Sequence, residues 1–423
     1  MTVAIIGGGA AGLLCACLSA RGGADVTLFE KNASGKLLSS EAFFDNAYLG
    51  KKLLITGKGR CNLTNNCDKE TFFSSVVTGA KFLYAAYDRF PPQRTMAFFE
   101  EAGLALKTER GNRVFPVSDK ALDVLRTLKN VLRKENVAVK RLAVTSVQKD
   151  AETFVLTDEN GIEHRFDAVV VATGGLSYPV TGSTGDGYRF AEAFGHTVTP
   201  RIPSLVPFEV EEQPLCSSLA GLAPKNVTLT VTDREKKKPV FSELGEMLFT
   251  HTGVSGPLVL SASAHTRPME PGRYTLHIDW KPALSPDTVD KKLVALFAER
   301  ANTDLANVLC AVLPKSMAAP MARFAHLDPA VKPHDLKKED RRRLAASLKD
   351  FTLTVAGFRP IDEAVVTSGG VKTSEIVPST MESKRVPGLY FIGEVLDLDA
   401  YTGGFNLQIA FMTAACAAAS LTE

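Results

Sequence analysis

Three glycines near the N-terminus have the spacing Gly-x-Gly-x-x-Gly. Gly7, Gly9 and Gly12 follow the apolar run Thr2–Ile6, and Glu30 comes 18 positions after Gly12. In this context the first glycine permits a tight turn, the second lets the backbone approach a pyrophosphate, and the third lets a helix pack closely on a strand. N–H groups at the helix start bind the anion, and the acid accepts hydrogen bonds from a ribose. The pattern predicts a dinucleotide site, and the Glu30 carboxylate argues against the 2′-phosphate of NADP there.

Both NAD and FAD contain the pyrophosphate that such a turn binds. Three further segments favour FAD. The helix expected after the turn, Ala10–Ala20, consists largely of small residues that permit close packing. The apolar run Ala168–Ala172 leads into Thr173-Gly174-Gly175, a short turn that FAD enzymes place near the cofactor. Near the C-terminus, Leu389–Ile392 leads into Gly393-Glu394, which would bring backbone N–H groups and an acid to the ribityl and pyrophosphate groups.

The segment Thr56–Asn62 is rich in glycine and basic residues. Gly57 and Gly59 free backbone N–H groups for anions, and Arg60 can neutralise phosphate or stabilise reduced flavin. A surface turn with a solvated arginine is the alternative. Cys61 could contact the flavin or be a small buried residue.

Apolar periodicity predicts the elements that position these groups. Strand, helix and strand over the first 30 residues form a βαβ unit, and a short strand is expected at Lys52–Ile55. Lys81–Ala102 is expected to be one helix, and strands alternate from Val137 to Phe166. Ser255-Gly256-Pro257 predicts a helix start with the serine as N-cap, able to receive an anionic substrate group.

Three prolines, Pro200, Pro203 and Pro207, mark a domain boundary. We predict an α/β FAD-binding domain made of residues 1–198 and 351–423. An inserted domain then occupies residues 199–350, β-rich over 205–280 and helical over 286–350.

Composition excludes several classes of protein. The 423 residues are 45% hydrophobic and 23% charged with a net charge of +2, so no global field attracts nucleic acid or an anionic membrane. Lys236–Lys238 is expected at a solvated hairpin tip, and the apolar run Ile409–Leu421 is too short to span a bilayer. Seven cysteines without a CxxC pair indicate neither zinc nor a dithiol centre and suit the cytoplasm. No metal site is predicted.

Longer motifs carry a resemblance to a known family. They are the segments Gly50–Asn65, Gly111–Pro116, Ala172–Gly187, Phe249–Pro257, Thr367–Val371 and Gly388–Gln408. Through them the chain resembles, over nearly its whole length, the HI0933-like flavoproteins, which include a bile-acid Δ4,6-reductase and an aminoacetone oxidase. The resemblance implies bound FAD, a Rossmann-type, glutathione-reductase-like domain, and an inserted domain with a β-barrel-like part and a helical part. An additional segment near Ala33–Tyr48, and Ala400 and Phe405 in place of Gly and Tyr, depart from the family pattern.

Motifs and resemblance together give one set of predicted cofactor contacts. In chain order these are Gly7, Gly9, Ala10, Ala11, Gly12, Glu30, Lys31, Lys52, Thr56, Gly57, Gly59, Arg60, Cys61, Asn62, Val144, Ala172, Thr173, Gly174, Gly393, Glu394, Asp397, Gly404, Asn406, Leu407 and Gln408. The catalytic group is left open, because flavin N5 carries the hydride itself. Tyr178, His251 and Tyr401 are the candidates for a proton donor or substrate contact.

No second Gly-x-Gly-x-x-Gly occurs between residues 31 and 350, so NADH or NADPH is expected to dock transiently at the flavin. The leading prediction is a reductase that passes hydride from NAD(P)H through flavin N5 to an activated C=C bond, such as an enone of a steroid-like or other small organic acid. The alternative is an oxidase of a small amine or amino-ketone that produces hydrogen peroxide. A flavin-bearing RNA-modification protein is disfavoured by the balanced charge. We therefore expect a small-molecule substrate with no nucleic-acid or membrane partner, and leave the oligomeric state open.

Overall fold

The computed structural model describes residues 1–33 and 48–423, and the chain divides into two units. One unit comprises Met1–Ser204 and Ile361–Glu423, and the other comprises Leu205–Pro360. The segment near Ala33–Tyr48 that departs from the family pattern lies outside the described residues, apart from its two ends.

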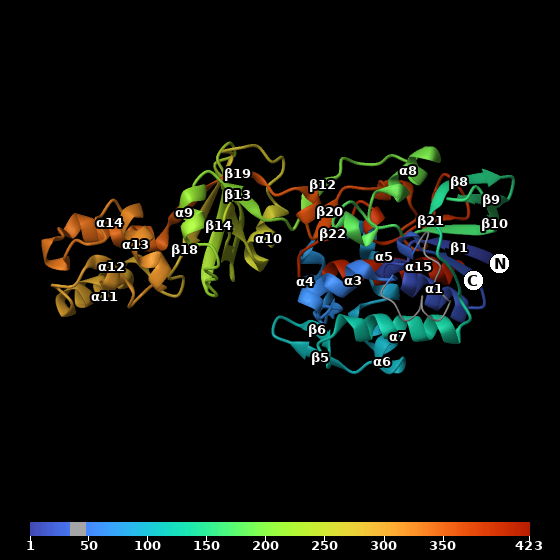
Figure 1. Ribbon diagram of the computed structural model, residues 1–423, viewed down its shortest axis with the longest axis horizontal. Coiled ribbons are helices and arrows are strands. Elements are labelled where there is room, and N and C mark those ends of the chain that lie inside the picture. The colour runs from blue at the N-terminus through green and yellow to red at the C-terminus, as the bar shows by residue number, and fades with distance from the viewer. Residues whose placement is uncertain (34–47) are drawn as a thin grey trace. The chain divides into compact units, whose positions relative to one another are not determined.

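A five-stranded parallel sheet forms the centre of the first unit (Figure 1). Its order is β21 (Leu389–Phe391), β11 (Ala168–Val171), β1 (Thr2–Ile6), β2 (Asp25–Phe29) and β7 (Ala138–Lys140). All four residues of β11 are buried, as expected for an apolar strand inside a parallel sheet. Because parallel strands end at one edge of the sheet, the turns after β1, β2, β11 and β21 all start from that edge.

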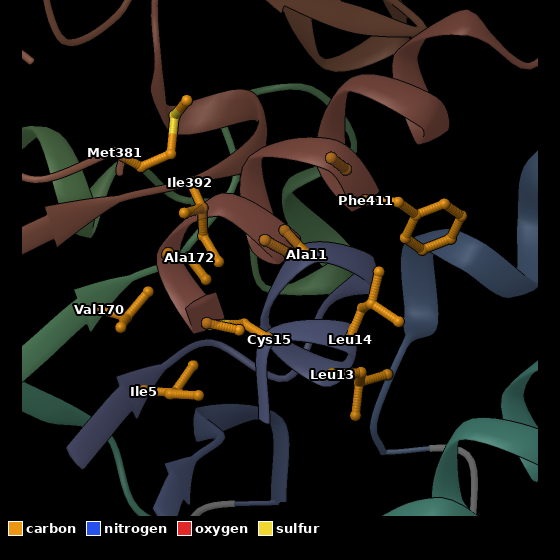
Figure 2. Close-up of a cluster of buried hydrophobic side chains, with 14 of the residues drawn as sticks. Ile5, Ala11, Leu13, Leu14, Cys15, Val170, Ala172, Met381, Ile392 and Phe411 are labelled. Carbon is orange, nitrogen blue, oxygen red and sulfur yellow. The ribbon is translucent and has the colours of Figure 1, made fainter. Parts of the chain in front are cut away.

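Two helices of small residues pack against each other beside this sheet. They are α1 (Ala10–Arg21) and α15 (Phe405–Ser420), and both are buried along most of their length. Figure 2 shows Ala11, Leu14 and Cys15 of α1 in one buried cluster with Ala172 and with Phe411 of α15. Their small side chains, chiefly alanine, let the two helices approach closely.

The remaining elements of the first unit surround this core. The helices are α3 (Lys51–Ile55), α4 (Lys69–Ser74), α5 (Tyr84–Arg89), α6 (Pro92–Glu101), α7 (Ala121–Lys134) and α8 (Asp186–Ala193). Two three-stranded antiparallel sheets consist of β8 (Val144–Asp150), β9 (Thr153–Asp158) and β10 (Glu163–Phe166), and of β3 (Thr64–Asn65), β6 (Arg113–Pro116) and β5 (Leu106–Glu109). Two strand pairs are β12 (Ile202–Ser204) with β20 (Val366–Ser368) and β4 (Val76–Thr78) with β22 (Asp399–Ala400). Short 3₁₀ helices cover Lys31–Ala33, Thr56–Gly59, Ala80–Leu83, Pro179–Thr181, Ile361–Glu363, Thr373–Glu375 and Gly393–Val395.

Two element predictions in this unit are wrong. Lys52–Ile55 is part of the helix α3 and not a strand, because a short apolar run has no periodicity that separates the two. The single helix expected over Lys81–Ala102 is interrupted: α5 ends at Arg89 and α6 begins at Pro92. Pro92 begins a new helix at a position where its missing N–H needs no partner.

The second unit contains a seven-stranded antiparallel sheet and helices α9 to α14 (Figure 1). The strand order is β15 (Lys238–Gly245), β14 (Val227–Asp233), β18 (Tyr274–Asp279), β19 (Phe351–Phe358), β13 (Phe208–Val210), β17 (Gly253–Ser255) and β16 (Leu248–Phe249). The helices are α9 (Gln213–Ser218), α10 (Pro257–Ser263), α11 (Pro286–Glu299), α12 (Leu305–Leu309), α13 (Lys315–Phe324) and α14 (Lys338–Lys349), with a 3₁₀ turn at Pro333–Asp335.

Two features of the second unit differ from the sequence predictions. The strand that begins at Phe351 pairs with β18 and β13 and so belongs to this unit, whereas the sequence placed it in the FAD-binding domain. The residue before helix α10 is Gly256 and not Ser255, which ends β17. Gly256 has a φ of +96°, and a Cβ there would lie 2.9 Å from the Cα of Met247, so only glycine fits. Among the described residues, no helix combines the length and hydropathy needed to cross a membrane.

Candidate functional site

The glycine turn after β1 is shaped by contacts with two neighbouring strands. The N–H of Gly7 donates to the carbonyl of Phe29 at 2.9 Å, and a Cβ on Gly7 would lie 2.5 Å from the carbonyl oxygen of Ala172. A Cβ on Gly12 would lie 1.9 Å from the carbonyl oxygen of Gly7. These two glycines are therefore required by close approach inside the protein.

Gly9 lies in a different environment. It precedes α1, and within residues 1–33 and 48–423 no side chain caps the helix N-terminus and no atom lies within 4 Å of a Cβ added at Gly9. The first N–H groups of α1, beginning at Ala10, thus lie beside open space. Uncapped N–H groups and the positive end of the helix dipole favour an anion at this position.

Glu30 is the acidic residue at the end of β2 and is only 6% exposed. Its carboxylate accepts the N–H of Gly8 at 2.9 Å and the N–H of Asn32 at 2.7 Å. Burial raises the pKa of this carboxyl above its usual range, and the two backbone donors and nearby lysines oppose that shift. The contacts tie the glycine turn to the chain after β2.

A pocket opens beside Glu30 at the edge of the parallel sheet. Five predicted contacts line it, namely Gly7, Glu30, Lys31, Val144 and Thr173. The other lining residues are not among the predicted contacts: Ile6, Phe29, Asn32, Leu142, Thr181, Gly182, Asp186 and Phe190. Asp186 forms an ion pair with Lys31, and the hydroxyl oxygen of Thr173 is buried with no hydrogen-bond partner in the described part of the chain. Asp186 could have been suspected, because it begins α8 within the Ala172–Gly187 motif.

A polar network joins three predicted segments. Lys52 on α3 donates to both oxygens of Glu394, at 2.7 and 2.9 Å, and to the hydroxyl of Ser177 at 2.6 Å. Glu394 also accepts the N–H of Thr367 at 2.9 Å and the hydroxyl of Ser177 at 3.0 Å. Lys52 and Glu394 therefore link the turns that follow β11 and β21. Ser177 and Thr367 lie within the Ala172–Gly187 and Thr367–Val371 motifs but are not among the predicted contacts.

The turn Thr56–Asn62 has the unusual backbone that its glycines suggest. Gly57, Gly59 and Cys61 all have φ between +57° and +85°. Arg60 is partly exposed and already has partners: it forms ion pairs with Glu109 and Asp119, and its guanidinium lies 4.1 Å from the ring centroid of Phe115. The side-chain oxygen of Asn62, by contrast, is buried without a partner.

Cys61 is completely buried, and burial raises the pKa of its thiol to about 12. A protonated, inaccessible thiol is a poor nucleophile, so the structure favours a packing role for Cys61. All seven cysteines are free.

We expect one thiol of the native protein to react readily with Ellman's reagent. Cys310 is exposed whereas the other six cysteines are buried, so one equivalent should be released before unfolding and seven after it. A Cys310→Ser protein should lose the first equivalent. A second thiol that reacts as quickly in the native protein would contradict the burial of Cys61.

The predicted contacts near the C-terminus divide into two groups. Gly393 lies against α1, because a Cβ there would come within 2.9 Å of the Cβ of Ala11, and Gly404 precedes α15 with a φ of +99°. Asp397 and Leu407 are half-buried. Asn406 and Gln408 instead bind protein groups. Asn406 pairs with the backbone of Ala400, as acceptor at 3.0 Å and donor at 2.7 Å.

Gln408 is fully buried in this segment and differs most from its predicted role. Its side-chain oxygen accepts the hydroxyls of Thr64 and Thr95, both at 2.7 Å, and its amide donates to the carbonyl of Phe90 at 2.8 Å. The structure therefore gives Gln408 an internal role in holding α15 against β3.

The three candidate catalytic side chains lie in different places. Tyr178 is half-buried with a φ of +52° and directly follows Ser177 of the polar network. Tyr401 is half-buried against the core of the same unit. His251 is exposed in the second unit, with its Nδ1 3.5 Å from the hydroxyl of Ser217.

Comparison with known proteins shows which family this chain belongs to. The HI0933-like protein Rossmann domain matches residues 1–420. The chain belongs to the HI0933-like family. This membership confirms the predicted resemblance, the Rossmann-type fold and the class of FAD-dependent oxidoreductase.

Two kinds of curated relative represent this family. A 3-dehydro-bile acid Δ(4,6)-reductase of Clostridium scindens is 31% identical over 426 residues, covering 100% of this chain and 99% of the relative. A ribosomal RNA dihydrouridine synthase of Escherichia coli is 34% identical, covering 98% of this chain and 96% of the relative. A protein of the same description from Haemophilus influenzae is 31% identical over 99% of this chain and 98% of its own length.

The described residues fit FAD. The open space at Gly9 beside N–H groups that no described side chain caps suits a pyrophosphate, and Thr173, whose buried hydroxyl has no hydrogen-bond partner among the described residues, is one of the residues that line the adjacent pocket. Bound FAD supplies a flavin ring that accepts and donates hydride.

Proposed function

We propose that this protein reduces a C=C bond conjugated to a carbonyl group, with NAD(P)H as the two-electron donor and FAD as the carrier. A hydride is added to the carbon distal to the carbonyl and a proton to the carbon beside it. The single observation that supports this most strongly is that the two kinds of relative, different in substrate, are both named for saturating a double bond. A carbonyl-conjugated C=C is present both in a 3-oxo-4,6-diene and in the uracil ring.

In the proposed site, the glycine turn and α1 bind the pyrophosphate, and Glu30 accepts hydrogen bonds from the adenosine ribose. The pocket lined by Val144 and Thr173 holds the adenosine. Lys52 and Glu394 hold the turns after β11 and β21 in place beside the ribityl chain. Tyr178 and Tyr401 are the proposed sources of the proton, and His251 a proposed substrate contact.

Two substrate classes follow from this chemistry. The first is an enone of a steroid-like or other small organic acid, as the sequence analysis predicted. The second is uridine in ribosomal RNA, which the sequence analysis disfavoured and which two relatives with 34% and 31% identity support. In both cases NADH or NADPH would dock transiently.

An anaerobic titration of the purified protein, monitored through its flavin absorbance, tests the proposal. NADH or NADPH should bleach the band, and an added 3-oxo-4-ene steroid acid or a uridine-containing RNA should restore it without oxygen. Bleaching by a small amine, with recovery only in air and peroxide as product, would replace the proposal with the oxidase. Failure of both conjugated substrates to restore the band would refute it.

A further inference from the structure

The charge of the chain is distributed unevenly. Residues 281–349, which contain α11 to α14, hold 13 lysines and arginines against eight aspartates and glutamates, a formal charge of +5. The whole chain has a net charge of +2, so the other residues together carry −3. The balanced total therefore conceals a basic region within the second unit.

Among the described residues, many cations of this region form no ion pair. Within the described residues, ion pairs involve Arg300, Lys332, Arg341, Arg343 and Lys349. In addition to Lys281 and Lys292, six basic side chains are in no ion pair among the described residues: Lys291, Lys315, Arg323, Lys337, Lys338 and Arg342. All six are exposed. Lys338 and Arg342 lie four residues apart on α14 and so share one helix face.

Lys281 and Lys292 line a pocket whose floor is apolar. The floor residues Leu284, Val289, Leu293, Val312 and Leu348 come from the segment before α11, from α11 itself, from the chain after α12 and from α14. Both lysines are without an ion-pair partner in the part of the chain that the structure describes. Two lysines that line a pocket together with apolar side chains are suited to an anionic group attached to a less polar body.

The segment that carries Lys281 is held firmly. Lys349 forms an ion pair with Asp279 at 2.6 Å and donates to the carbonyls of Lys281 and Leu284, at 2.9 and 2.7 Å. The N–H of Trp280 donates to the carbonyl of Leu348 at 3.0 Å. The pocket is thus formed before any ligand arrives.

The two pocket lysines oppose each other electrostatically. Burial lowers the pKa of Lys281 below its usual range, and the charge of Lys292 lowers it further. An anion between them would relieve this repulsion, because an opposite charge favours the ammonium forms.

We propose that the helical part of the second unit, residues 281–349, binds RNA, and that Lys281 and Lys292 together hold one backbone phosphate above the apolar floor. The proposal deepens the proposed function and rests on its uridine candidate, since it assigns the surface through which an RNA substrate is bound. The other cations of residues 281–349 that are in no ion pair contact further phosphates. RNA is favoured over a small carboxylic acid because a single carboxylate would need the two pocket lysines alone, whereas eight unpaired cations suit a polyanion.

Salt-dependent RNA binding tests this proposal. The FAD-loaded protein is titrated into a fluorescein-labelled, uridine-rich single-stranded RNA of about 30 nucleotides at several salt concentrations, without reductant. A Lys281→Gln/Lys292→Gln protein should bind about tenfold more weakly, with a slope of log K against log salt that is smaller by about 0.7, as expected for one lost phosphate contact. A Lys338→Gln/Arg342→Gln protein, altered only on an exposed helix face, should weaken binding in the same direction.

The matched control is Lys237→Gln/Lys238→Gln, which removes the same charge from the exposed β14–β15 turn of the same unit. It should leave RNA affinity and salt slope close to those of the unaltered protein, and melting temperatures verify that all variants fold. Absence of RNA binding, or equal losses in the control and the two test variants, would overturn the proposal. It would also be overturned if a steroid carboxylic acid bound through Lys281 and Lys292 while RNA did not bind.

This experiment separates the two proposals. RNA binding needs no hydride transfer, so RNA that is bound through residues 281–349 but does not restore the flavin band in the anaerobic titration would refute the uridine candidate of the proposed function and leave the RNA surface intact. Reduction of a free enone by a protein that does not bind RNA would refute the RNA surface alone.

Discussion

A Gly9→Val protein is expected to fold normally and to purify without the yellow colour of FAD. Among the described residues, no atom lies within 4 Å of a Cβ added at Gly9, so we expect the larger side chain to leave the internal packing unchanged. It would instead occupy the space in front of the N–H groups of α1, where the pyrophosphate is proposed to bind. We expect the FAD affinity to fall by at least about 100-fold, equivalent to about 2.8 kcal/mol. The ratio of flavin to protein absorbance measures bound FAD, and thermal unfolding measures the fold.

Two other glycines serve as controls for this variant. Gly357 in β19 also has no atom within 4 Å of an added Cβ, so Gly357→Val should fold and keep its FAD. Gly12→Val should destabilise the protein itself, since an added Cβ would lie 1.9 Å from a backbone oxygen. Stoichiometric FAD in purified Gly9→Val protein would contradict the placement of the pyrophosphate at this turn.

A Glu30→Ala protein is expected to have the second largest loss of FAD. The carboxylate accepts two backbone N–H groups, from Gly8 and Asn32, and is proposed to accept the ribose hydroxyls as well. Hydrogen bonds to a charged group contribute about 1.5–3 kcal/mol each. Loss of the ribose contacts and of the contacts that hold the glycine turn should therefore weaken FAD binding by on the order of 100-fold. Fluorescence titration of the apoprotein with FAD gives the dissociation constant.

The control for Glu30→Ala must lose a similar carboxylate elsewhere. Asp233 in the second unit is fully buried and accepts the N–H groups of Glu235 and Lys236, at 3.0 and 3.2 Å. Asp233→Ala should therefore lower the melting temperature and leave the FAD dissociation constant unchanged. If Glu30→Ala lowers only the melting temperature, Glu30 has a structural role and the ribose assignment is wrong.

The parts of the site that the sequence predicts well are those in which a local pattern dictates the backbone. The spacing of Gly7 and Gly12 predicts that other backbone atoms approach both residues closely. In the structure, a Cβ added at Gly7 or Gly12 would lie 2.5 or 1.9 Å from a carbonyl oxygen. The parallel order of β1, β2 and β11 then brings Glu30 and Thr173 to one pocket, although 143 positions separate them.

Side-chain partners that are distant in the chain could not be predicted in this way. Arg60 has the composition of a phosphate-binding residue, but its carboxylate partners lie 49 and 59 positions away and belong to no motif. Gln408 illustrates the same limit, because its hydrogen-bond partners Thr64 and Thr95 become neighbours only through tertiary packing. The local charge excess of residues 281–349 was readable from the sequence and was hidden by averaging over the whole chain.

The assembly of the first unit from both ends of the chain dictates an order of events during synthesis on the ribosome. Residues 205–360 emerge complete before the strand β21 and the helix α15 are translated. Until then β11 lacks its outer neighbour, and the small-residue face of α1 has no helix to cover it. The nascent chain must therefore keep its first α/β segment partly open through about half of its synthesis, while the inserted unit can already fold. The proposed FAD site would accordingly be completed late, since Gly393 and Glu394, two of its proposed contacts, are translated only when synthesis is nearly finished.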